Sequence, residues 1–204
     1  MGVAGLREPR GRVLASLNCD GRWGLGLCAA CLMLLLPSLA GQSARLLLRY
    51  DRTALAQGQW WRLLTAHLVH LDLRHALLNC VGLLLMWALF ARDYSPRQWV
   101  LVLLGAALAI DAGLWLGDST VLWYVGSSGV LHGVMAAGGL AHIRRGERDG
   151  WILALVLALK LVYEQRVGAL PFSGSDPVVV DAHLYGVLGG IVVAAFLHPR
   201  RLSL

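Results

Sequence analysis

Charge is what this sequence has little of. Only 15% of its 204 residues are Asp, Glu, Lys or Arg, whereas 57% are apolar and the mean hydropathy is +0.62. A soluble domain carries about 25% charged residues, and its apolar runs stop well short of the ~20 residues that cross a bilayer. Several windows of this chain approach that length. The composition therefore excludes an ordinary soluble domain and predicts a polytopic membrane protein in contact with the lipid bilayer.

Lysine is almost missing, because the net charge of +6 comes from 17 arginines and a single lysine against 12 acidic residues. The sequence has no basic stripe with interleaved aromatic residues of the kind that follows a phosphate backbone. We therefore expect no nucleic-acid partner. The arginines are better explained by the excess of positive charge in the loops on the inner side of a membrane.

Cysteine is also scarce, with four residues in the whole chain. Cys28 and Cys31 have the Cys-x-x-Cys spacing of redox and metal sites, but they lie in the middle of the first apolar run. A buried cysteine there packs as a small apolar side chain. We expect no metal and no cofactor.

Apolar runs define the predicted architecture, which is an all-α membrane protein with a six-helix bundle. The predicted spans cover residues 23–40, 75–90, 99–116, 128–143, 151–163 and 178–197. Residues 1–21 are expected to form a short cytoplasmic tail, and residues 22–204 a single domain. The first span also resembles a cleavable signal peptide. The connection of residues 41–74, rich in Arg and Trp, is expected to lie along the membrane interface.

Basic residues orient the six predicted spans. With both termini inside, 11 basic residues fall on the inner side and six on the outer side. This bias predicts a multi-pass protein with its N- and C-termini in the cytoplasm.

Polar residues gather at one depth on the second, fourth and sixth spans, which run in the same direction. His75, Ser128 and His183 each lie 16 or 17 residues before the arginine that ends the span. At 1.5 Å per residue this places all three ~24–26 Å above the inner boundary, near the outer surface. Asn79 is one helical turn deeper, on the same face as His75. Buried polar residues in a membrane are candidates for function.

These residue types point to acyl transfer by a serine nucleophile. The Ser128 hydroxyl needs a base to take its proton, and His183 is suited to that role near neutral pH. The Ser128 N–H, the Asn79 amide and the His75 ring are candidate donors to the oxyanion. A Gly-x-Ser-Gly motif alone occurs often by chance. A soluble α/β-hydrolase is excluded, because its Gly-x-Ser-x-Gly elbow would require glycine where Val130 stands.

Glycines allow the predicted serine and histidine helices to meet. Gly129 and Gly133 form a small-xxx-small face on the fourth span, and Gly186 and Gly190 form one on the sixth. Hydrolysis also needs water, so we expect a cavity open to the outer side.

Three ordered motifs resemble those of the rhomboid intramembrane serine proteases. They are His70-x-x-x-x-His75-x-x-x-Asn79, Gly126-x-Ser128-Gly129 and Ala182-His183-x-x-Gly186-x-x-x-Gly190, preceded by Trp61-Arg62. The resemblance implies a Ser–His dyad without an acid, in which Ser128 is the nucleophile and His183 the base. It places His75, Asn79 and Gly126 at the oxyanion and substrate-binding positions.

Within the rhomboids, the sequence is similar to the rhombosortase branch. The similarity lies in residues 128–133, residues 180–186 and the pair Lys160 and Glu164, and includes His132 where many rhomboids have tyrosine. It implies a protease of the bacterial inner membrane, with its site near the periplasmic face. Its expected substrates are exported proteins with Gly-Gly-type hydrophobic C-terminal sorting tails.

Several polar residues have structural interpretations. His132, one turn below Ser128, is expected to pack under the His183 ring, with proton transfer as the alternative. We expect His70 to shape the first connection, His67 to lie at the interface and Asp181 to start a helix. Lys160 and Glu164 are expected to pair with each other as i,i+4 neighbours. Asp111 has no evident partner.

Three other functions are considered. One is a general rhomboid protease that cleaves transmembrane segments. Another is a catalytically silent, rhomboid-like chaperone, which would need neither Ser128 nor His183. The third is a proton pathway, but the sequence lacks a chain of ionisable groups reaching the inner side.

Overall fold

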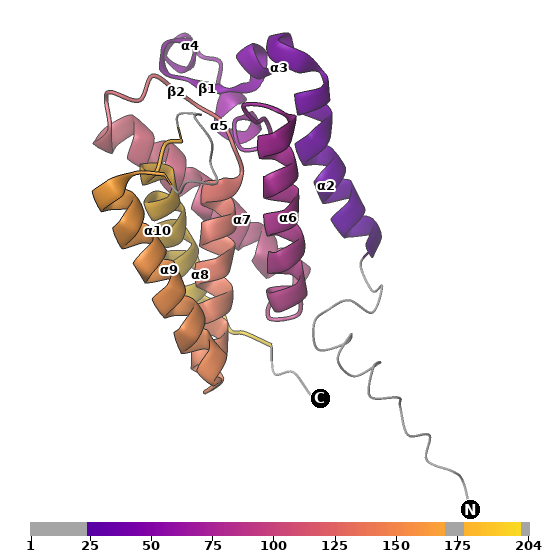
Figure 1. The fold of residues 1–204 in the computed structure, drawn as a ribbon, viewed down its shortest axis with the longest axis vertical. Helices are drawn as coiled ribbons and strands as arrows, with labels where there is room; N and C mark the ends of the chain where they lie inside the picture. Colours follow the sequence, from indigo (N-terminus) through magenta and orange to yellow (C-terminus); the bar gives the residue numbers. More distant parts are fainter. Residues whose placement is uncertain (1–23, 170–177, 201–204) are drawn as a thin grey trace, which may run out of the picture.

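The computed structural model describes residues 24–169 and 178–200, so the predicted tail of residues 1–21 lies outside the described part. Long helices run side by side, and short elements cover one end of the bundle (Figure 1). The long helices are α2 (Gly24–Leu39), α6 (Leu73–Phe90), α7 (Pro96–Ala112), α8 (Ser128–Arg144), α9 (Arg148–Val167) and α10 (Asp181–Phe196).

Each predicted span corresponds to one of these helices, with shifted ends. Helix α6 begins two residues early because the Asp72 side chain caps it by accepting a hydrogen bond from the His75 N–H, at 2.7 Å. Helix α9 extends past both predicted ends, since Arg148 and Arg166 are helical as well. Helix α7 continues into the π-helical turn η1 (Gly113–Gly117).

Length and composition identify fewer membrane crossings than the sequence predicts. Among the described residues, Leu73–Phe90 and Pro96–Gly117 qualify as spans. The pair α2 and α3 (Gly41–Leu48), bent by 110°, qualifies if it counts as one span, and Asp181–Phe196 is a shorter apolar helix. The helical membrane bundle is confirmed, whereas the number of six crossings stays a prediction.

The connection between α2 and α6 folds over one end of the bundle (Figure 1). It contains α3, strand β1 (Tyr50–Asp51), α4 (Arg52–Ala56) and α5 (Arg62–Thr65), and β1 pairs antiparallel with β2 (Trp123–Tyr124). Arg62 is buried and donates hydrogen bonds of 2.9 Å to the carbonyl groups of Leu46 and Arg49. This guanidinium therefore holds α3 and the following turn against α5.

Helix α8 is the centre of the bundle and packs against α10 through backbone rather than side chains. A Cβ added at Gly129 would lie 2.7 Å from the Ala182 carbonyl oxygen, and one at Gly133 would lie 2.6 Å from that of Gly186. A Cβ at Gly186 or Gly190 would come closer still to the α8 backbone. The two predicted glycine pairs therefore face each other, and this close approach fixes the positions of Ser128 and His183.

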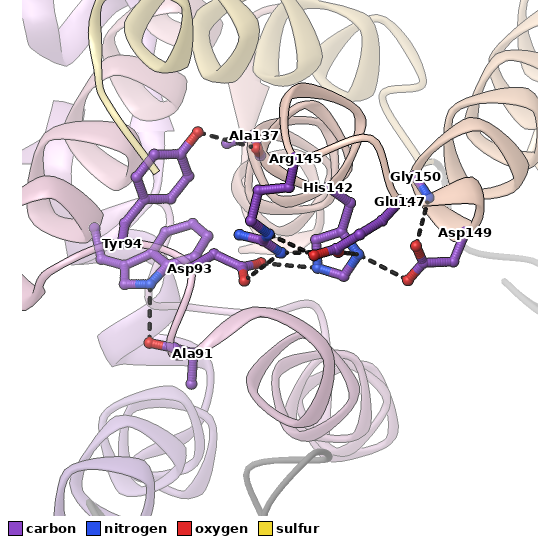
Figure 2. A network of polar contacts seen from close by, with 10 residues as sticks. Ala91, Asp93, Tyr94, Ala137, His142, Arg145, Glu147, Asp149 and Gly150 are labelled. Atoms are coloured by element: carbon purple, nitrogen blue, oxygen red, sulfur yellow. Dashed lines mark hydrogen bonds and ion pairs between the residues drawn. The ribbon is translucent and has the colours of Figure 1, made fainter. Parts of the chain in front are cut away.

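The α6–α7 and α8–α9 connections lie at the opposite end of the bundle from the short elements (Figure 1), and a polar cluster links them (Figure 2). We call it the far-end cluster; it consists of Asp93, His142, Arg145, Glu147 and Asp149. The Asp93 carboxylate, which is 1% exposed, lies 3.0 Å from both the His142 Nε2 and an Arg145 nitrogen. The other ring nitrogen of His142 lies 2.7 Å from Asp149. The cluster thus joins the α6–α7 turn to the C-terminal end of α8 and the start of α9.

Candidate active site

The structure brings together the serine and histidine that the sequence singles out. Ser128 is the first residue of α8, and His183 lies in the first turn of α10. The Ser128 Oγ lies 2.9 Å from the His183 Nε2, which is hydrogen-bond distance. His183 is 5% exposed, so its ring faces the serine from a buried position. A hydroxyl with an imidazole nitrogen at this distance has the arrangement needed for base-assisted nucleophilic attack.

The chain segment before Ser128 is shaped by glycine and tyrosine. Gly126 has φ +121°, a conformation that favours glycine over any residue with a Cβ. The hydroxyl of Tyr124 donates to the Gly126 carbonyl oxygen at 2.6 Å, while the Gly126 N–H donates to the Ala66 carbonyl at 2.9 Å. Both bonds fix the turn that delivers Ser128 to the start of α8.

The His183 ring is held on its other side by a carboxylate. Its Nδ1 lies 2.8 Å from the Glu164 Oε2 of α9. The other carboxylate oxygen of Glu164 lies 2.6 Å from the Lys160 Nζ. The pair expected between Lys160 and Glu164 is therefore present, but the contact with His183 is one that sequence reasoning missed. The i,i+4 spacing places both side chains on one face of α9 without indicating which helix that face meets.

The ring of His132 stacks on that of His183, with centroids 4.2 Å apart and planes at 19°. The His132 Nδ1 lies 2.7 Å from the Ser128 carbonyl oxygen. The expected packing under His183 is thus observed. Because Nδ1 is bound to its own helix, His132 presents a ring face rather than a ring nitrogen to His183.

The predicted oxyanion residues His75 and Asn79 lie on α6 and face the same cavity as Ser128. Asn79 donates to the His75 carbonyl oxygen at 3.0 Å, and its Oδ1 accepts from the Ser127 hydroxyl at 3.1 Å. Ser127 in turn lies 3.2 Å from the Nε2 of the buried His70. The amide oxygen of Asn79 is therefore turned away from a developing oxyanion. Ser127 is a second residue that the sequence analysis missed, since it was hidden beside Ser128.

A cavity of about 300 Å³ opens next to these side chains, between α6, α8 and α9. Ser128, His183, His75 and Asn79 line it. A second cavity of about 310 Å³ lies along the segment that contains β2, and it shares Ser128 and His75 with the first. Ser128 therefore lies at the junction of the two cavities.

Comparison with known proteins identifies the family. The sequence-family model of the rhomboid domain matches residues 57–200 of this chain. The chain belongs to the rhomboid family. It is 25% identical over 139 residues to the rhomboid protein YdcA of Bacillus subtilis (strain 168), with 68% of each chain covered. It is 24% identical over 153 residues to the rhomboid protease GluP of the same organism, covering 72% of this chain and 28% of that protein.

The predicted family and its enzyme class are thus confirmed. The protein is a multi-pass membrane protein and an intramembrane serine protease. These matches show the rhomboid family, and the rhombosortase branch stays a prediction.

Two further polar residues, His67 and Asp111, are buried and lie next to each other. His67, which was predicted to lie at the membrane interface, is buried within the protein and only 4% exposed, and its depth in the membrane stays a prediction. Its Nε2 lies 3.4 Å from the Oδ1 of Asp111, so the acid with no evident partner has one. This distance is that of an ion pair, and the geometry falls short of a direct hydrogen bond. Asp181 starts α10 as predicted and accepts a bond of 2.9 Å from Gln165.

A metal site would compete with the hydrogen bonds of this rhomboid site. His132, Glu164 and His183 each offer one ligand atom, all within 4.8 Å of one another. Both nitrogens of His183 are already engaged by Ser128 and Glu164. Hydrogen bonding therefore accounts for the arrangement of these three side chains.

Proposed function

We propose that this rhomboid protease cleaves peptide bonds with Ser128 as the nucleophile and His183 as the general base. The observation that carries the proposal is the distance of 2.9 Å between the Ser128 Oγ and the His183 Nε2, across two helices whose backbones touch. Ser–His pairs at this distance activate a hydroxyl that is otherwise a weak nucleophile.

The chemistry follows from this pair. As the Ser128 Oγ attacks the scissile carbonyl carbon, its proton moves to the His183 Nε2 and an Oγ–C bond forms. The same proton then passes to the amide nitrogen of the leaving segment while the C–N bond breaks. Water attacks the resulting ester, giving up a proton to His183, and the proton returns to Ser128 as the Oγ–C bond breaks. No other reagent is required.

The oxyanion of each intermediate needs hydrogen-bond donors. The Ser128 N–H lies at the first turn of α8, where backbone N–H groups have no partner within the helix. We propose that it acts together with the His75 ring and the second amide proton of Asn79. Gly126 contributes space, because a Cβ there would lie only 3.2 Å from the His75 Cε1. Removing one oxyanion donor costs about 10²–10³ in kcat in other serine proteases.

For the substrate, we propose exported proteins with a Gly-Gly-type hydrophobic sorting tail at the C-terminus. The support is the similarity of residues 128–133 and 180–186, and of the Lys160 and Glu164 pair, to rhombosortases. The corresponding location is the bacterial inner membrane, with both termini in the cytoplasm and the site near the periplasmic face. The arginine distribution and the depth of His75, Ser128 and His183 support this orientation.

Co-expression with a reporter tests both parts of the proposal. The reporter is an exported fluorescent protein followed by Gly-Gly, about 20 apolar residues and a short arginine run. We expect cleavage by the wild type and none by Ser128→Ala or His183→Ala. A second reporter replaces Gly-Gly by Leu-Leu. Equal cleavage of both reporters would favour a general rhomboid protease, and unimpaired cleavage by Ser128→Ala would refute the catalytic assignment.

A further inference from the structure

The geometry points to Glu164 as a positioning residue for His183, so that Ser128, His183 and Glu164 work as a triad. The inference rests on the proposed roles of Ser128 and His183, and it departs from the dyad that the sequence resemblance implies. Three helices each contribute one member, namely α8, α10 and α9.

The three side chains form a continuous hydrogen-bonded chain. The Ser128 Oγ lies 2.9 Å from one ring nitrogen of His183, and the Glu164 Oε2 lies 2.8 Å from the other. A neutral imidazole has one donor nitrogen and one acceptor nitrogen. Because an ionised carboxylate only accepts, Glu164 requires the proton on Nδ1. Nε2 is then left with the lone pair that must receive the Ser128 proton.

The burial of Glu164 indicates that its contact with His183 is a fixed part of the fold. Its side chain is 2% exposed, and that of His183 is 6% exposed. A buried carboxylate is costly unless it is paired and hydrogen-bonded. Lys160 supplies the compensating charge at 2.6 Å from Oε1, which leaves Oε2 for the ring. A purely structural Lys160–Glu164 pair could be formed at the helix surface and would not need a side chain turned toward His183.

The other groups that face His183 do not replace Glu164. His132 of α8 contributes a stacked ring whose Nδ1 is committed to the Ser128 carbonyl. Asp181, on the same helix as His183, accepts from Gln165 instead. Among the described residues, Glu164 is therefore the carboxylate that meets the ring edge opposite Ser128.

The expected role is to hold the productive tautomer and to stabilise the imidazolium that forms when Ser128 attacks. In Ser-His-Asp proteases, replacing the acid by its amide lowers kcat by about 10⁴. Here Lys160 already balances part of the charge of Glu164. We expect Glu164→Gln to lower the rate of the chemical step by roughly 10²–10³, with the initial binding of a reactive probe unchanged.

Covalent labelling by a fluorescent fluorophosphonate measures that step. Its Oγ–P bond forms as the P–F bond breaks and fluoride leaves, and the Ser128 proton moves to the His183 Nε2. Labelling of the full chain in lipid nanodiscs is measured at a series of probe concentrations. This yields the maximal labelling rate and the half-saturating probe concentration as separate quantities. Asp181→Asn is the matched control, because it removes a neighbouring carboxylate between the same two helices without touching His183.

We expect Glu164→Gln to reduce the maximal rate with little change in the half-saturating concentration or the melting temperature, and Asp181→Asn to match the wild type. Glu164→Asp, which keeps the charge, is expected to retain more activity than Glu164→Gln. Equal rates for Glu164→Gln and Asp181→Asn would overturn the inference, as would a reversed order of the Asp and Gln variants. The Asp variant keeps the test open if the Gln variant does not fold. Labelling of Ser128→Ala would instead refute the proposed function itself.

Discussion

The close packing of α8 on α10 makes a strong prediction for Gly133→Ala. The new methyl group would lie 2.6 Å from the Gly186 carbonyl oxygen and 2.6 Å from the Ala106 Cβ, whereas ordinary contact begins at 3.4 Å. The difference of about 0.8 Å must be met by moving helices apart, because the Gly186 oxygen belongs to the backbone. Overpacking of this kind costs about 1–3 kcal/mol.

The same movement would disturb the site one turn above. The Ser128 Oγ lies 2.9 Å from the His183 Nε2. A helix shift of about 0.8 Å would lengthen this distance beyond that of a good hydrogen bond. Misplacing reacting groups by about 1 Å can cost about 10²-fold in rate. We therefore expect Gly133→Ala to lower the rate of fluorophosphonate labelling by roughly 10–100-fold and to lower the melting temperature.

Gly139→Ala is the matched control on the same helix. Its Cβ would lie 3.8 Å from the Gly150 carbonyl oxygen and 4.0 Å from the Leu153 Cβ, which is ordinary contact. Both variants gain the same helix propensity of about 1 kcal/mol over glycine. Gly139→Ala should therefore label at the wild-type rate and be equally or more stable. Indistinguishable melting temperatures and labelling rates for the two variants would refute the backbone contact between α8 and α10.

Three further predictions concern the far-end cluster and the oxyanion side. Asp93→Asn breaks a buried ion pair with Arg145, which keeps its second partner Glu147, and should lower the free energy of unfolding by about 1–3 kcal/mol, seen as a lower melting temperature in detergent. The hydrogen bond from Arg145 lowers the pKa of Glu147 below its ordinary value of 4.5. This contact therefore stabilises the fold at pH values above about 4.5, and its contribution is lost as the pH falls further and Glu147 takes up a proton. The melting temperature of Glu147→Gln should consequently fall less on acidification than that of the wild type. Ser127→Ala removes the donor to the buried Asn79 amide oxygen, so it should slow reporter cleavage by about tenfold and lower the free energy of unfolding by about 1–3 kcal/mol; an unchanged cleavage rate would show that Asn79 needs no such support.

The sequence could predict the parts of the site that depend on position along a helix. Counting residues placed His75, Ser128 and His183 at one depth, and the glycine spacing predicted which faces of α8 and α10 could approach. Both inferences need only the helical rise and the 3.6-residue period. The structure confirms the contact between the helices, because the glycines of α8 meet those of α10, whereas the common depth in the membrane stays a prediction.

Contacts between helices that share no motif could not be predicted in this way. Periodicity gives the face of α9 on which Glu164 lies, but the neighbour of that face depends on how the bundle is assembled. The same holds for Asp111, whose partner His67 lies 44 positions earlier in the chain. Arg145 is one of the 11 inner basic residues that the sequence analysis used only to orient the spans, whereas its contact with Asp93 depends on the α6–α7 turn folding under α8.

The way α9 is attached explains why Glu164 can be tested without unfolding the protein. Buried positions on α9 are Gly150, Leu157 and Glu164, spread along its length. At the far end, a Cβ on Gly150 would lie 2.9 Å from the Gly139 carbonyl oxygen, and Asp149 contacts His142 at 2.7 Å. These contacts hold α9 against α8 independently of the site. Replacing Glu164 therefore removes one of several attachments, and a loss of labelling with an unchanged melting temperature would be attributable to His183 rather than to a displaced helix.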